Sequence, residues 1–157
     1  VVELAYPSYK SKDKLDDWYI LILLHYLDLA DGTPLYHQAV HFGELKDGLI
    51  RGSRFDKTVE REFASFLSDK KDEDIINLCK SLGGEIIKSK FDLSVVFYLF
   101  PNYPVTLNIW FADDEFGAVG NMLVDKSADN YLTIEDDVVA GEFMLRYIFE
   151  RYNELYM

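Results

Sequence analysis

The chain has 157 residues, of which 49% are hydrophobic and 15% aromatic. That is enough for one domain with a proper core, and it excludes a disordered chain. There are 16 Lys and Arg residues against 28 Asp and Glu residues, so the formal net charge is −12. This balance excludes nucleic acid and anionic membrane surfaces as partners, because both are bound through clustered positive charge. A basic or cationic partner fits it.

The single cysteine, Cys79, excludes an intramolecular disulfide and favours a reducing compartment. The first residues contain no basic segment followed by an apolar core, so no signal peptide is predicted. The longest apolar run, Trp18 to Leu24, falls well short of the ~20 residues that cross a bilayer. We therefore expect a cytoplasmic protein in which residues 1–157 form a single domain.

Residues 15–30 predict a helix that begins at a capping Asp13 or Asp16 and ends at Asp31-Gly32. Its apolar residues point in almost every direction around the helix axis. A helix that is apolar all round is typical of a protein interior. We therefore expect this helix to be central and buried.

The next segments predict a short strand over residues 36–42 and a glycine-rich loop or hairpin over residues 43–54. Two amphipathic helices follow, one capped by Asp56 and the other by Asp72. Gly83-Gly84 ends the second, since glycine adopts the left-handed conformation at low cost.

The apolar period then changes to two. Residues 91–100 and 105–111 flank the turn Pro101-Asn-Tyr-Pro104 and predict an antiparallel hairpin. A third strand is predicted over residues 118–124, and a helix with a regular apolar stripe begins at Thr133. The predicted fold is α+β: an antiparallel meander sheet of three or more strands packed by helices on one face, with a long C-terminal amphipathic helix.

Carboxylates near the strand ends form the first candidate site. Asp114, Glu115, Asp125 and Glu135 would suit a hard divalent cation if they converged, as in a metal-dependent hydrolase. The alternative is structural, because turns are polar and acids in the first turn of a helix complement its dipole. Glu135 and Asp136 fit that explanation.

Other candidate chemistry is sparser. His37 and His41 share a predicted strand face but lack the third protein ligand that zinc needs. Cys79 lies on an apolar helix stripe and is expected to pack in the core. The aromatic side chains around Trp110 are of the kind that line small-molecule pockets. No nucleophile–base set and no nucleotide motif is present, so no catalytic residue, metal or cofactor is assigned.

Two stretches carry a family resemblance: Pro104-Val-Thr-Leu-Asn-Ile-Trp-Phe-Ala-Asp-Asp-Glu-Phe, and Asn121 to Asp136 followed by Gly141-Glu142. Together with His25-Tyr-Leu and Gly32-Thr-Pro-Leu, they make nearly the whole chain similar to the uncharacterised family called domain of unknown function 3786. The resemblance implies a protein of anaerobic bacteria or archaea.

Some members of that family carry an added cysteine-rich iron–sulfur segment. With Cys79 alone, this chain cannot hold such a cluster, so a redox role would belong to a partner. Asn130 stands where the resemblance places a histidine, which argues against a base or metal ligand there.

The leading hypothesis is a non-catalytic ligand-binding or accessory domain, linked through the resemblance to iron–sulfur or corrinoid metabolism. Its candidate ligand-binding residues are Trp110, Asp114, Glu115, Asn121, Asp125 and Tyr131. Two rivals are open: a divalent-metal-dependent hydrolase that uses the carboxylates, and an acidic adaptor that docks a basic protein.

Overall fold

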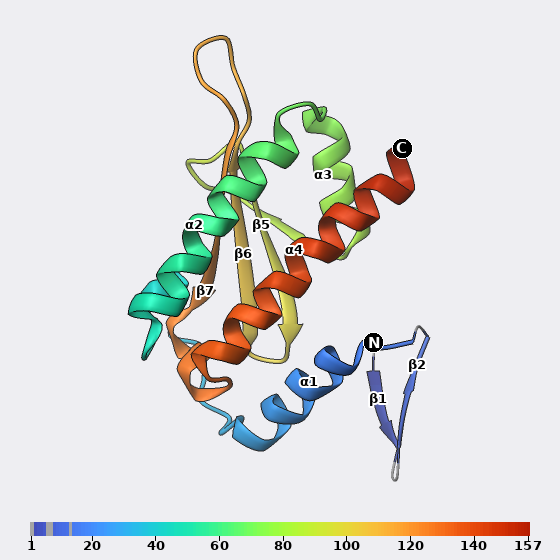
Figure 1. Cartoon of the computed structure of the whole chain (residues 1–157), viewed down its shortest axis with the longest axis vertical. Coiled ribbons are helices and arrows are strands. Elements are labelled where there is room, and N and C mark those ends of the chain that lie inside the picture. The colour runs from blue at the N-terminus through green and yellow to red at the C-terminus, as the bar shows by residue number, and fades with distance from the viewer. Residues whose placement is uncertain (1, 6–7, 13) are drawn as a thin grey trace.

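A computed structural model describes residues 2–5, 8–12 and 14–157. The elements follow in the order β1 (Val2–Ala5), β2 (Ser8–Ser11), α1 (Asp17–Leu29), β3 (Ala39–Val40), the 3-10 helix η1 (Phe42–Glu44), α2 (Gly48–Leu67), α3 (Asp72–Ser81), β4 (Glu85–Ile87), β5 (Leu93–Phe100), β6 (Tyr103–Trp110), β7 (Val119–Asp125), the 3-10 helix η2 (Lys126–Asn130) and α4 (Ile134–Tyr156). The fold is α+β, as predicted (Figure 1).

The main sheet is antiparallel, with strand order β3-β7-β6-β5-β4. The predicted meander is its centre, β5-β6-β7. Helices α2 and α4 cross one face of this sheet (Figure 1). Val95, Leu107 and Met122 are paired across the three central strands and buried beneath the helices. The other face carries the matching row Ser94, Asn108 and Asn121, because alternate strand residues point to opposite faces.

Helix α2 begins earlier than the sequence predicts. The glycine-rich stretch 43–54 is not a loop or hairpin, because α2 already starts at Gly48. A Cβ atom on Gly48 or Gly52 would lie 2.2 Å from the Phe42 carbonyl oxygen. Both glycines therefore permit close packing of the helix on η1. Asp56 is not a helix cap: it lies inside α2, and its carboxylate accepts hydrogen bonds from the backbone N–H groups of Phe42 and Gly43 at 3.0 and 2.8 Å.

Helix α1 is found where it was predicted, but it is not buried. The Asp16 carboxylate caps it by accepting a 2.9 Å hydrogen bond from the Trp18 N–H; the alternative cap, Asp13, lies outside the described residues. Only Ile22 and Tyr26 are buried within it. Five of its apolar side chains are exposed, so α1 is a surface helix: Trp18, Leu21, Leu24, Leu27 and Leu29. In the described part of the chain, no helix is both long and apolar enough to cross a bilayer.

Helix α4 forms the long amphipathic C-terminal element that the sequence predicts. Thr133 precedes it, and the Thr133 hydroxyl donates to the Asp136 carboxylate at 3.0 Å. A Cβ atom on Gly141 would meet the Phe55 ring of α2 at 2.6 Å and the Met122 sulfur at 3.4 Å. The close approach that this glycine allows is therefore mainly to α2 rather than to the sheet.

Candidate functional site

The six candidate ligand-binding residues lie along β7 and beyond both of its ends. Trp110 is paired with Val119 at the start of β7, and Asp114 and Glu115 are in the exposed loop that joins the two strands. Asp125 ends β7, six residue steps or roughly 20 Å from Val119. The structure therefore divides the six residues between two ends of the sheet.

Trp110 lies at the end of β6 on the face of the sheet that the helices leave uncovered. Its side chain is 41% exposed, and its ring centroid lies 5.1 Å from that of Phe91. The loop that carries Phe91 is attached here, because the Asp92 carboxylate accepts a 2.9 Å hydrogen bond from the Phe111 N–H. Trp110 is thus both half-exposed and flanked by a loop.

Asn121 belongs to a polar row that crosses the uncovered face. The Ser94 hydroxyl donates to the Asn108 side-chain oxygen at 2.6 Å, and the Asn108 amide donates to the Asn121 oxygen at 3.1 Å. Ser94 and Asn108 are buried. Since buried polar groups are costly unless they are paired, these bonds account for the row structurally.

Asp125 ties three segments together. Its carboxylate accepts hydrogen bonds from the N–H groups of Tyr36, Gln38 and Ser127 at 2.9, 3.1 and 3.0 Å. Partial burial acts to raise the pKa of this carboxyl, but the hydrogen bonds outweigh it and lower the pKa. Both oxygens are therefore occupied by the fold.

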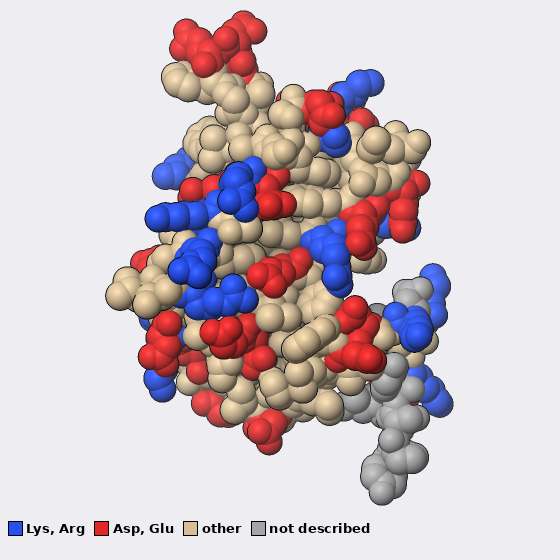
Figure 2. All heavy atoms as spheres, viewed as in Figure 1, with Lys and Arg blue, Asp and Glu red and all other residues tan. Residues whose placement is uncertain are grey.

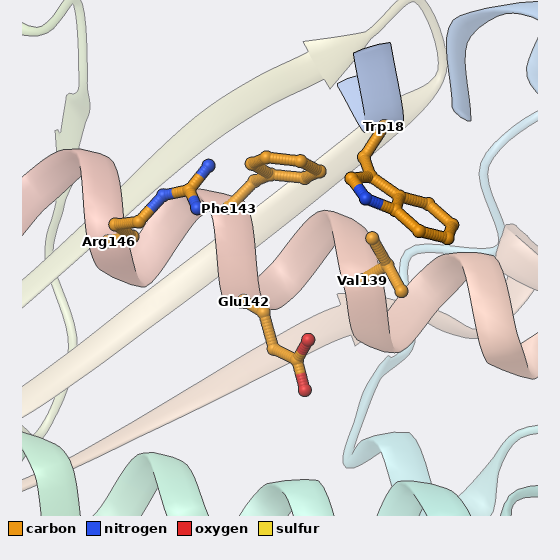
Figure 3. A pocket seen from close by; sticks show the side chains of 5 residues that line it. All are labelled: Trp18, Val139, Glu142, Phe143 and Arg146. Carbon is orange, nitrogen blue, oxygen red and sulfur yellow. The ribbon is translucent and has the colours of Figure 1, made fainter. Parts of the chain in front are cut away.

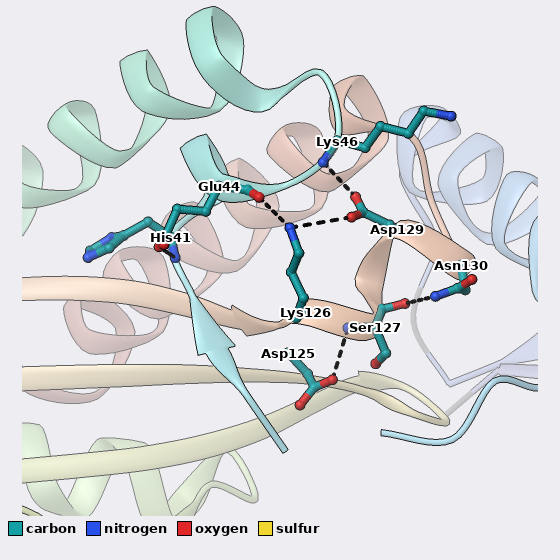
Figure 4. Close-up of polar contacts among 8 residues, drawn as sticks. All are labelled: His41, Glu44, Lys46, Asp125, Lys126, Ser127, Asp129 and Asn130. Carbon is teal, nitrogen blue, oxygen red and sulfur yellow. Dashed lines mark hydrogen bonds and ion pairs between the residues drawn. The ribbon is translucent and has the colours of Figure 1, made fainter. Parts of the chain in front are cut away.

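Figure 4 shows further contacts around Asp125, in the corner where β7 leads into η2. The Lys126 ammonium donates to the Glu44 carbonyl oxygen at 2.5 Å and lies 3.8 Å from the Asp129 carboxylate. Asp129 in turn accepts from the Lys46 N–H at 2.9 Å. The corner is a structural junction between η1 and η2.

Tyr131 is buried, and its hydroxyl donates to the Thr33 carbonyl oxygen. Its ring stacks on Tyr26 with centroids 5.7 Å apart, and Tyr26 stacks on Phe100 at 4.4 Å. This side chain attaches α1 and the segment that follows it to the rest of the fold.

The carboxylates proposed for a metal-dependent hydrolase do not converge. Asp114 and Glu115 lie in the loop beyond one end of β7, whereas Asp125 lies at the other end. Glu135 pairs with Arg51 at 3.2 Å. Among the described residues, no group of three or more His, Cys, Asp or Glu side chains is arranged to hold a metal ion.

One strongly perturbed titratable group is a residue that the sequence did not single out. Asp137 is fully buried, and its Oδ1 accepts a hydrogen bond from the Tyr103 hydroxyl while its Oδ2 has no partner. Burial raises the pKa of Asp137 to about 8, the Tyr103 hydrogen bond opposes that rise, and the charges of Asp129 and Asp136 add to it. The acids that open α4 were attributed to the helix dipole, so this burial was missed.

Beside it, Asp136 joins α4 to α1. Its Oδ1 lies 2.9 Å from the His25 Nδ1, a contact between residues 111 positions apart. Farther along, Arg146 lies 3.9 Å from Asp16, and the rings of Phe143 and Tyr19 meet at 6.1 Å. Helices α1 and α4 therefore run in opposite directions along a shared seam.

An open groove of about 390 Å³ lies on this seam, lined by Trp18, Val139, Glu142, Phe143 and Arg146 (Figure 3). The Arg146 guanidinium stands over the Phe143 ring, 4.7 Å from its centroid. Trp18 lies above Val139 and is 63% exposed. The all-round apolar pattern of residues 15–30 was the signal for this surface, but it was interpreted as interior.

The family model described as "Domain of unknown function (DUF3786)" matches residues 3–147. The chain belongs to the DUF3786 family. Searches of the curated proteins and of the solved structures find no match to it. Within DUF3786, this chain presents a half-covered sheet, a buried carboxyl at the start of α4 and an apolar surface helix.

Proposed function

We propose that this DUF3786 chain is a non-catalytic accessory domain that binds a basic, apolar helical segment of a protein partner through α1. The observation that carries the proposal is the exposure of α1. Its Trp18, Leu24 and Leu27 side chains are 63%, 54% and 47% exposed, and Leu21 and Leu29 are exposed as well. Contiguous exposed apolar surface of this kind is typical of interaction sites.

The charge around α1 supports a basic partner. The helix itself contains Asp17 and Asp28 but no Lys or Arg, and Asp16 and Asp31 flank it. An apolar strip with an acidic rim complements a helix that has an apolar face and basic flanks. The same rim disfavours an anionic lipid surface.

The adjoining groove offers a place for an apolar side chain of the partner. Trp18 and Val139 continue the apolar surface of α1 onto α4, and large aromatic side chains are common anchors of such interfaces. A helix laid along α1 would place one of its apolar side chains in this groove.

The link to iron–sulfur or corrinoid metabolism, which the family resemblance implies, assigns any redox centre to the partner. Burial raises the pKa of the Cys79 thiol to about 11, and a ligating cysteine must be a thiolate. Its role here is packing within α3, where it is buried.

The test is a fluorescence titration with a designed helical peptide of about 18 residues that has a leucine face and lysine flanks. Its twin carries glutamate in place of lysine. In a W110F background, where Trp18 is the remaining tryptophan, the lysine peptide should shift Trp18 emission to the blue and bind more weakly as salt is added. The glutamate twin should not bind.

Matched variants localise the effect. L24S/L27S should weaken binding of the lysine peptide at least about tenfold, because each leucine contributes roughly 1 kcal/mol or more of buried apolar surface. The control I86S/I87S removes two exposed apolar side chains of β4, which are 42% and 39% exposed, and should leave binding unchanged. Equal losses in both variants, or no binding of the lysine peptide, would contradict the proposal.

A further inference from the structure

A second outward-facing stripe lies on α2, and it has the opposite charge. Ile50, Arg54, Lys57 and Arg61 are spaced by four, three and four residues and are all exposed, so they share one face of the helix. Next to them, Leu49 is 80% exposed. Figure 2 shows Lys and Arg side chains gathered over α2. In a chain with net charge −12, this is a basic helix surface that begins with two exposed apolar side chains, Leu49 and Ile50, and α1 would bind a segment of this kind.

The matching stripe on α1 has the same spacing. Asp17, Leu21, Leu24 and Asp28 are also separated by four, three and four residues, and all four are exposed. At 1.5 Å per residue, each stripe is about 17 Å long. Asp17, Asp28, Arg54 and Lys57 form no ion pair in the described structure; Arg61 pairs only with its neighbour Glu62, at 3.4 Å.

We infer that α2 of a second copy of this chain is the segment that covers α1, so that the protein associates with itself through α1–α2 contacts. The inference rests on the proposed function, because it names the partner segment that α1 binds. Pairing α1 with α1 would oppose Asp to Asp, and pairing α2 with α2 would oppose Arg and Lys to their own kind. Only the crossed pairing places the acidic residues of one stripe near the basic residues of the other.

The contact requires two molecules. Within one chain, α1 and α2 both pack against α4, which lies between them (Figure 1), and the two stripes face away from it into solvent. The net charge of −12 opposes association over long distances, but at physiological salt it is screened beyond about 8 Å. Directly facing charges and buried leucines therefore decide the contact.

The size of the contact sets its strength. One helix pair about 17 Å long buries far less than the roughly 800 Å² per partner of a stable interface. A single α1–α2 contact is therefore weak and depends on protein concentration. Two reciprocal contacts about a twofold axis would close a dimer, whereas repeated single contacts would extend into a chain.

Sedimentation velocity over a wide concentration range tests the inference on the full chain. The wild type should associate with rising concentration, and the association should weaken as salt is raised. D17K/D28K and R54E/K57E should each reduce the association constant at least about tenfold, since two attractions become repulsions. The controls D114K/E115K and K71E/K88E change the net charge equally at exposed sites on other surfaces, and both should associate like the wild type.

The decisive experiment mixes the two charge-reversal variants, D17K/D28K and R54E/K57E. D17K/D28K keeps a native α2 but has a basic α1, and R54E/K57E keeps a native α1 but has an acidic α2. Neither variant alone can therefore form an attractive α1–α2 contact. Their new charges are also complementary, with lysines on one α1 and glutamates on the other α2. An equimolar mixture should therefore form complexes that contain both variants, at protein concentrations where each variant alone is monomeric.

The outcomes separate the two proposals. A wild type that stays monomeric while the lysine peptide still binds α1 overturns self-association and leaves the proposed function standing. Failure of the peptide and of self-association overturns both. Association that is lost equally in the control variants, or that is not restored by mixing, places the contact elsewhere and contradicts this inference.

Discussion

Asp137 has an ionisable side chain in a position that disfavours its charged form. It has no exposed surface, and one of its oxygens has no partner. A buried carboxylate of this kind favours its neutral form. The Asp137 carboxyl therefore holds a proton at the first turn of α4, beside the contact between Asp136 and His25.

The proton makes stability depend on pH. The pKa of Asp137 in the folded state is about 8, whereas the pKa of an aspartate in an unfolded chain is about 4. Between about pH 4 and 8, the folded state binds a proton that the unfolded state has released, so the free energy of unfolding falls as pH rises. The slope is at most about 1.4 kcal/mol per pH unit for one group.

We expect D137N to remove this slope, because an amide does not titrate. Urea unfolding at several pH values should show the stability of D137N rising relative to the wild type from about pH 5.5 to 8, then levelling. D114N, which alters an exposed loop carboxyl, should run parallel to the wild type. Parallel curves for D137N and the wild type would contradict proton storage at Asp137.

The six ligand-binding candidates mark the limit of what adjacency in sequence can predict. Trp110, Asp114 and Glu115 are close to Asn121 and Asp125 along the chain, yet β7 carries its two ends apart. In contrast, the contact between Asp136 and His25 joins residues 111 positions apart. Nothing in the local pattern could reveal it, because it depends on how α1 docks on α4.

At the scale of elements, the spacing of apolar residues predicted the positions of those helices and strands that local interactions determine. The three central strands, α3 and α4 were placed correctly, since their apolar residues repeat with strand or helix spacing. The start of α2 was missed because glycine also permits close backbone packing, which is a tertiary effect. The exposure of α1 was missed for a related reason: an apolar pattern alone does not show whether the rest of the chain covers the helix.

Replacing Gly52 with alanine tests the packing of α2 on η1. In an isolated helix, alanine would be favoured over glycine by about 1 kcal/mol. Here, a Cβ atom would lie 2.2 Å from the Phe42 carbonyl oxygen and 2.4 Å from its carbon, and backbone cannot yield as a side-chain end can. We therefore expect G52A to lower the free energy of unfolding by about 2 kcal/mol or more, as overpacked core substitutions do.

Gly117 is the matched control, because a Cβ atom there meets nothing within 4 Å. Urea denaturation should show G117A within about 0.5 kcal/mol of the wild type. If G52A were as stable as G117A, close packing would not be the reason for a glycine-rich first half of α2.

At the scale of the whole molecule, the protein carries a large excess of negative charge. Figure 2 shows acidic side chains scattered in patches over the visible face, with several basic ones gathered over α2. Many acids have structural partners, such as Asp125 and Asp56 with backbone N–H groups. The excess of 12 negative charges nonetheless remains, and such an excess destabilises a compact state through self-repulsion.

We therefore expect salt to stabilise the folded chain. Raising NaCl from about 0.01 M to 0.1 M shortens the screening length from about 30 Å to 10 Å, which weakens repulsion between surface acids more than it weakens close ion pairs. The melting temperature, measured at low protein concentration to keep the chain monomeric, should rise by a few degrees, as a change near 1 kcal/mol produces. K71E/K88E adds negative charge and should steepen the dependence on salt, whereas D114K/E115K removes it and should flatten the dependence. Identical salt slopes in the three proteins would mean that local ion pairs, and not the net charge, control stability.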